Sequence, residues 1–140
     1  STGTQAGYGM WIVRLVDACL QVGDITAGLA ITTTILATPT QPGVAAGLAR
    51  IYRLHGELLL RQETPDYSAA EASFTQALDI AREQKAHTLE LHAAISLAKL
   101  WLSEKPKAAR QLLEETCAWF TEGRDIRDWQ EAQALLQNNV

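Results

Sequence analysis

The chain has 140 residues, of which 47% are hydrophobic and 20% are charged. This length fits one domain that is large enough to bury a core. The net charge of −4 argues against a general nucleic-acid binder or membrane-surface binder, because both present a strongly basic face. The sequence also contains no apolar run of the roughly 18–20 residues that a membrane span requires.

The first segments predict a helical hairpin over residues 8–37, preceded by frayed residues 1–7. Apolar residues recur with helical spacing from Tyr8, and Gly23-Asp24 interrupts them. We expect Gly23 to cap the first helix and Asp24 to begin the second. The second helix is rich in threonine, a mediocre helix former, so packing must hold it.

Two further hairpins follow, over residues 44–84 and 88–122. Pro39 and Pro42-Gly43 separate the first hairpin from the second, whose helices over about 44–62 and 67–83 flank Thr64-Pro65-Asp66. Lys105-Pro106 divides the third hairpin into helices over about 88–103 and 107–121. Gly123 is expected to cap the last of these, and a short capping helix is expected over about 128–137. No segment predicts a strand, so the predicted fold class is all-α.

Small residues recur at near-equal spacing at the start of the second helix of each hairpin: Gly28, Ala70 and Ala109. Positions four and seven residues later hold Thr32, Phe74 and Leu113, and then Ile35, Ala77 and Thr116. Helices approach closely only where side chains are small, so we expect Gly56 to face Ala70. We expect Phe74 to fill the gap between neighbouring hairpins, and the hairpins to stack.

These residues carry a family resemblance. Tyr52, Gly56, Leu59, Ala70, Phe74 and Ala77 match the pattern of a tetratricopeptide (TPR) repeat. His55 departs from that pattern and is expected to be a seam residue with a hydrogen-bonded ring. The stretch from Leu48 to Leu136 also resembles the C-terminal repeat region of large bacterial proteins. The motifs that carry this resemblance are GELLLRQ, AEASFTQALDIAREQKAHTLELHAAISLAKLW, and WFTEG followed by EAQALL. Those proteins join a class III adenylate or guanylate cyclase, or a DNA-binding regulatory domain, to an AAA-type ATPase and TPR repeats.

The resemblance implies a single TPR-like domain over residues 1–140, an α-α superhelix of about three helical hairpins plus the C-terminal capping helix. The chain begins without an initiator Met, so we expect a fragment of a longer protein. The cyclase and ATPase segments are absent from these 140 residues, and neither activity is assigned to them. No signal peptide is recognisable, so a cytoplasmic location is expected.

Few residues predict chemistry. The sequence has neither G-x-x-x-x-G-K-[ST] nor G-x-G-x-x-G. His87, Glu90 and His92 do not share one helical face, which argues against a metal site. Cys19 and Cys117 have no base partner at a recognisable spacing and are expected to be buried free thiols. We therefore expect no enzyme activity, no catalytic residue, no metal and no cofactor. The tryptophans are expected to pack in apolar stripes: Trp11, Trp101, Trp119 and Trp129.

A peptide-binding groove is predicted on the concave face that the first helices of the hairpins would line. Its expected residues are Asp17, Gln21, Arg50, Arg53, Glu57, Arg61, His92, Lys99 and Ser103. Four fixed cations against two acids would make this groove locally basic, and arginine can clamp carboxylates with two hydrogen bonds. The groove would then bind an acidic or C-terminal peptide. The alternative is that these side chains are ordinary solvated ones.

Two functions are compatible with these patterns. The first is a non-catalytic protein–protein interaction and regulatory module of a bacterial signalling protein. It would dock a peptide, a neighbouring domain or a second copy on its concave face or stack end. Self-association through Trp11, Ile12 and the helix over 25–36 is expected because terminal hairpins lack a neighbour. The alternative is a small-molecule-sensing repeat domain of a STAND-like ATPase regulator, which a pocket with convergent polar groups would favour.

Overall fold

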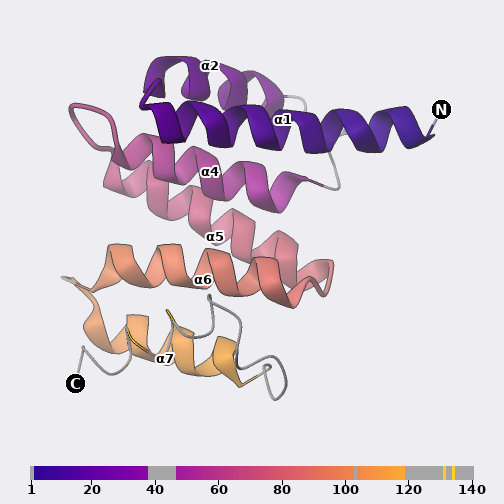
Figure 1. Cartoon of the computed structure of the whole chain (residues 1–140). Helices are drawn as coiled ribbons and strands as arrows, with labels where there is room; N and C mark the ends of the chain where they lie inside the picture. The colour runs from indigo at the N-terminus through magenta and orange to yellow at the C-terminus, as the bar shows by residue number, and fades with distance from the viewer. Residues whose placement is uncertain (1, 38–46, 103, 119–130, 132–133, 135–140) are drawn as a thin grey trace. The chain divides into compact units, whose positions relative to one another are not determined.

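A computed structural model of the chain describes residues 2–37, 47–102, 104–118, 131 and 134 (Figure 1). The described residues form helices and contain no strand, which confirms the predicted all-α fold of helical hairpins. The helices are α1 (Thr2–Val22), α2 (Ile25–Leu36), α4 (Leu48–Leu60), α5 (Tyr67–Glu83), α6 (His87–Trp101) and α7 (Pro106–Cys117). None of the helices in this part of the chain is long and apolar enough to cross a membrane.

The chain divides into two compact units, residues 1–77 and 78–140, with the boundary inside α5. In the first unit α1 and α2 form a hairpin, and α4 packs against both of its helices. In the second unit α6 and α7 form a hairpin.

Among the described residues, two helices are followed by a residue with a positive φ, and only one of these residues is a glycine. Gly23 has a φ of +82°, and the amide of Asp24 donates to the Cys19 carbonyl at 2.9 Å. The Asp24 carboxylate in turn accepts from the Ala27 amide at 3.2 Å, so both caps predicted at Gly23-Asp24 are confirmed. At the end of α5 the left-handed residue is Lys85, with a φ of +56°. Lysine is strained in this conformation, and the sharp reversal it makes brings the end of α5 beside the start of α6.

The core of the first unit is built where α1, α2 and α4 meet. It consists of Ile12, Val13, Val16, Leu20, Ile51, Leu54 and Leu58, with half-buried α2 side chains around it. Gly28 allows α2 to approach closely, because a Cβ at that position would lie 2.8 Å from Leu58 Cδ2. Thr32, four residues later, is wholly buried. Its hydroxyl lies 3.1 Å from the Gly28 carbonyl, which gives this buried polar group a partner.

Gly56 of α4 lies against the ring of Phe74 on α5. A Cβ placed on Gly56 would lie 2.5 Å from Phe74 Cε1, and the three nearest atoms all belong to that ring. The glycine makes room for the Phe74 ring. This contact lies inside one hairpin, and the facing of Gly56 and Ala70 and the filling of a gap between hairpins by Phe74 stay predictions. A ring needs more space than a methyl group, which is why the position opposite it has no side chain.

We predict that Gly56→Ala lowers the free energy of unfolding by about 1–2 kcal/mol. At so short a contact, overpacking should cost the upper part of the usual range, about 2–3 kcal/mol, and replacing glycine by alanine in a helix returns about 1 kcal/mol. Equilibrium urea unfolding measures the difference. Gly28→Ala is the matched control, because its new Cβ would meet the rotatable end of Leu58 and should cost less. A Gly56→Ala variant as stable as the wild type would show that the Phe74 ring is free to move away.

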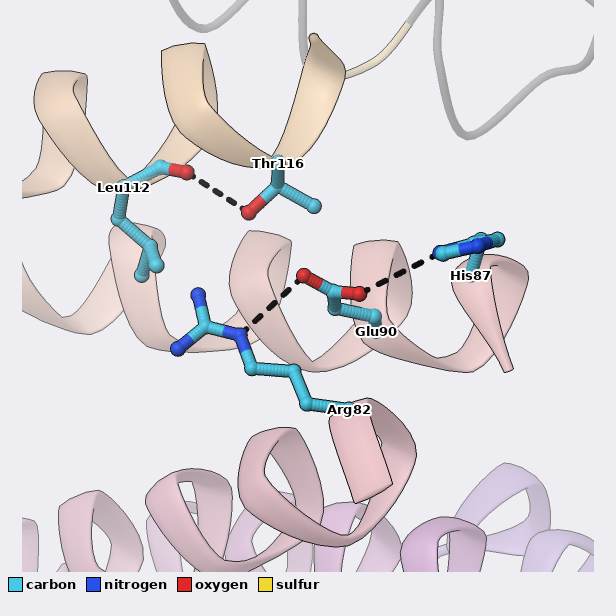
Figure 2. Close-up of polar contacts among 5 residues, drawn as sticks. All are labelled: Arg82, His87, Glu90, Leu112 and Thr116. Atoms are coloured by element: carbon cyan, nitrogen blue, oxygen red, sulfur yellow. Dashed lines mark hydrogen bonds and ion pairs between the residues drawn. The ribbon is translucent and has the colours of Figure 1, made fainter. Parts of the chain in front are cut away.

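The core of the second unit lies between α6 and α7. Its buried residues are Leu91, Ile95, Ala98, Ala109 and Leu113. Thr116 is also buried, and its hydroxyl donates to the Leu112 carbonyl at 2.7 Å (Figure 2). Ala109, Leu113 and Thr116 are the three positions that the repeat alignment singled out in this hairpin. All three are buried, as are Ala70, Phe74 and Ala77 on α5.

Several predicted boundaries differ from the observed ones. α1 begins at Thr2, where frayed residues were expected. Residues 2–7 contain no proline, and each residue added to an established helix forms one further backbone hydrogen bond. α4 begins after Gly47, its N-cap, although the predicted helix began at residue 44. Several predictions lie outside the described residues: the breaks at Pro39 and Pro42-Gly43, Trp119, Trp129, Gly123, and all of helix 128–137 except residues 131 and 134, which are helical.

Candidate functional site

The residues of the predicted peptide groove are distributed over both units. Asp17, Gln21, Arg50, Arg53, Glu57 and Arg61 belong to the first unit, His92 and Lys99 belong to the second, and Ser103 lies outside the described residues. The three of them on α4 and Arg61 at its C-cap are exposed or half-buried. Gln21 Nε2 donates to Asp17 Oδ2 at 3.1 Å, and Lys99 forms an ion pair with Glu131. The groove stays a prediction.

His55 is the seam residue that its position in the repeat predicted. It is half-buried, and its Nδ1 lies 2.7 Å from the Thr32 hydroxyl oxygen. When neutral His55 carries its proton on Nδ1, the ring donates to the Thr32 hydroxyl oxygen. The Thr32 hydroxyl proton then remains for the Gly28 carbonyl. The expected hydrogen-bonded ring is confirmed.

Acidification should weaken the fold through His55. Burial disfavours the imidazolium form and lowers the pKa of His55 below its ordinary value of 6.5. As the pH falls below that value, the unfolded chain takes up the proton before the folded chain does, so the free energy of unfolding falls. The fall ends once the pH passes below the folded-state pKa. Urea unfolding across this pH range should show a steeper loss for the wild type than for His55→Gln. Equal slopes would contradict the assignment.

The outer face of α1 is apolar and exposed, and of the two α1 residues predicted to support self-association it includes Trp11 but not Ile12, which is buried. Trp11 is 62% exposed and Val22 is 79% exposed, while Leu15 between them is 37% exposed. Ala18 lies on the same face and is also exposed. Ile12, one residue from Trp11, is buried, so the expectation that Trp11 packs in the core is wrong. In the sequence this face is a second apolar stripe, directly beside the stripe that is buried.

The remaining tryptophan of the described chain differs from Trp11. Trp101 is half-buried against the α6–α7 core, as predicted. Lys105 Nζ lies 5.2 Å from the centre of its ring, within the range of a cation–π contact. The expectation of buried thiols needs a correction as well, because Cys19 and Cys117, which form no disulfide, are only half-buried.

A buried carboxylate, Glu90, joins the end of α5 to the start of α6 (Figure 2). Its side chain is only 5% exposed, and Arg82 Nε donates to its Oε2 at 3.2 Å. His87 Nδ1 lies 3.6 Å from its Oε1, one helical turn earlier. The two basic side chains therefore approach the two oxygens of one carboxylate. Glu90 also lies in the first turn of α6, where the helix dipole favours a negative charge.

A cavity of about 630 Å³ opens beside this carboxylate, inside the second unit. Its walls are formed by Arg82, Lys85, His87, Glu90 and Glu115. The volume is in the range of small-molecule sites, which are about 300–1,000 Å³. The sequence could not place these five residues together, because they come from two helices, a turn and the far end of α7. In the part of the chain that the structure describes, no three His, Cys, Asp or Glu side chains gather where they could hold a metal ion.

Comparisons of the chain with models of protein families, with curated proteins and with solved structures found no match.

Proposed function

We propose that this chain is a non-catalytic TPR-like module of a cytoplasmic bacterial signalling protein, and that it binds an amphipathic helix of a partner chain on the outer face of α1. The supporting observation is that α1 is apolar on two sides. One side is built into the core through Ile12, Val13, Val16 and Leu20, and the other presents Trp11, Leu15 and Val22 to solvent. A surface helix that serves only its own fold needs one apolar stripe, so the second stripe supports a role in binding.

The composition of this face suits recognition of a helix. Tryptophan is enriched among the residues that contribute most to protein–protein binding, because it buries a large area at a small cost in side-chain entropy. Ala18 in the middle of the face allows another helix to approach closely. The hairpin beneath it, with Ile12 and Val16 buried, holds the face in place before a partner arrives. Such preorganisation lowers the entropic cost of binding.

The test is site-specific photocrosslinking in cells that express the natural full-length protein. A photoreactive amino acid at position 11 or 15 should crosslink to a defined helical segment, which mass spectrometry then identifies. The same amino acid at Asp79 or Thr88, which are exposed residues of other helices, is the matched control. Equal crosslinking at the test and control positions would reject the proposal.

The cavity of the second unit favours a second candidate function, sensing of a small molecule. Arg82 and Lys85 offer positive charge, and Glu115 offers negative charge on the same walls. A ligand that carries both an acidic and a basic group would meet complementary charges there.

Free amino acids carry both groups and are suitable probes. In an NMR titration, one of them should shift the side-chain resonances of Arg82 and His87 saturably, and a Lys85→Ala/Glu115→Gln variant should weaken the effect. If every free amino acid tested produces only linear, non-saturating shifts, this function is rejected.

A further inference from the structure

The exposed apolar residues of α1 follow the spacing of a coiled-coil seam. Trp11, Leu15, Ala18 and Val22 are separated by four, three and four positions, which are the intervals between alternating a and d positions of a heptad. All four are exposed. The buried residues of the same helix, Ile12, Val13, Val16 and Leu20, occupy other heptad positions, so the seam is additional to the core.

Resting on the interaction function proposed above, we propose that the helix bound by this face is α1 of a second copy of the chain, in an antiparallel two-fold arrangement. An axis that crosses the helix between residues 16 and 17 sets Trp11 opposite the partner's Val22. It also sets Leu15 opposite the partner's Ala18. Each layer then combines a larger with a smaller side chain, which is the self-complementarity that a two-fold interface demands.

Parallel pairing would be poorly packed by comparison. It would set the two Trp11 side chains against each other and would leave the two Ala18 methyl groups facing across a gap. A gap loses the contacts that the neighbouring atoms would otherwise make. The order of side-chain sizes along the helix therefore favours the antiparallel arrangement.

Charge at the edge of the seam favours the same arrangement. Arg14 and Gln21 occupy one edge of the face, at equivalent heptad positions, and Gln21 is hydrogen-bonded to the Asp17 carboxylate at 3.1 Å. In an antiparallel pair, equivalent edges of the two helices meet. Arg14 would then lie against the partner's Gln21 and near the partner's Asp17, so unlike charges approach at both ends of the seam. In a parallel pair Arg14 would meet the opposite edge, at the partner's Cys19.

The size of the face sets the strength of the dimer. From Trp11 to Val22 the seam covers about 16 Å of helix at about 1.5 Å per residue. Two such strips bury less than the roughly 1,200 Å² at which stable interfaces begin. The dimer should therefore be weak and concentration-dependent, which is typical of a contact that tethering in a larger protein would strengthen.

Sedimentation equilibrium of the purified chain from low-micromolar to millimolar concentration tests the dimer. We expect a monomer–dimer equilibrium that Leu15→Glu and Trp11→Glu each weaken by about tenfold or more, because a charge would be forced into an apolar contact. Tyr67→Glu is the matched control: Tyr67 is a large side chain, 61% exposed, on α5, and its replacement should leave the equilibrium unchanged. A chain that stays monomeric, or a dimer that Leu15→Glu does not weaken, would overturn the proposal.

Disulfide crosslinking tests the direction of the two helices. In a Cys19→Ala/Cys117→Ala background, the pair Leu15→Cys/Ala18→Cys should form a covalent dimer, while neither single cysteine should. Crosslinking of the single variants would establish parallel helices and overturn the arrangement. If the chain is monomeric but photocrosslinking at position 11 still identifies a helix of another protein, only the assignment of the bound helix to a second copy of the chain is wrong. If both experiments are negative, the proposed function fails too.

Discussion

Replacing Phe74 by alanine is expected to lower the free energy of unfolding by about 3–5 kcal/mol. The ring is fully buried, and its edge lies against Gly56, a position that has no side chain to move inward. On this side the space that the ring leaves is bounded by backbone, so no side chain of position 56 can fill it. Equilibrium urea unfolding followed by circular dichroism measures the loss as a lower midpoint.

Two variants at or near the same turn of α5 serve as controls. Phe74→Leu keeps much of the apolar volume and should cost less than about 1.5 kcal/mol. Thr75→Ala changes the next residue, which is exposed and bonded only to the backbone of its own helix, and should change stability by less than about 0.5 kcal/mol. If Phe74→Ala costs no more than Thr75→Ala, the ring is not the central contact of α4 and α5.

The repeat positions could be predicted from the sequence because steric limits act on them directly. Gly28, Ala70 and Ala109 are small for the same reason, and all three are buried. Their near-equal spacing predicted the helical hairpins without any knowledge of the contacts between helices. The identity of the contact at Gly56 could not be predicted, because a missing side chain shows that something lies close without showing what. Ala70 and Phe74, one turn apart, were equally reasonable candidates.

The outer face of α1 was only partly predicted, for a different reason. Trp11 and Ile12 are adjacent in sequence, and an apolar pattern with helical spacing passes through both. Such a pattern identifies a helix, but it cannot assign two neighbouring stripes to core and solvent. Only the position of α2 and α4 decides which stripe is covered, and this depends on residues far along the chain.

The polar site around Glu90 was only partly accessible to sequence analysis. Glu90 and His87 are three residues apart on one helix, so their proximity could be foreseen, and they were considered as metal ligands. Arg82 is eight residues from Glu90 and on another helix. The two meet because the chain reverses at Lys85 with a positive φ, a conformation that lysine rarely adopts and that no residue preference would have predicted.

Replacing Arg82 by alanine is expected to lower the free energy of unfolding by about 2–3 kcal/mol. Removing one partner of a buried ion pair costs about 3–5 kcal/mol, and the 44% exposure of Arg82 reduces that figure by letting water reach the pair. Most of the cost comes from leaving the Glu90 carboxylate, 5% exposed, without its hydrogen-bond donor. Urea unfolding at neutral pH measures the loss.

The chain contains a nearly ideal control for this prediction. Arg110 Nε lies 3.0 Å from Glu114 Oε1, and the arginine is again 44% exposed, but the glutamate is 54% exposed. The distances and the arginine exposures are thus closely matched, while the carboxylate of Glu90 is buried and that of Glu114 is not. Arg110→Ala should cost about 0.5 kcal/mol or less. Equal losses for the two variants would show that burial of Glu90 contributes nothing. An Arg82→Ala/Glu90→Ala variant should be no less stable than Arg82→Ala, because no buried charge is then left unpaired.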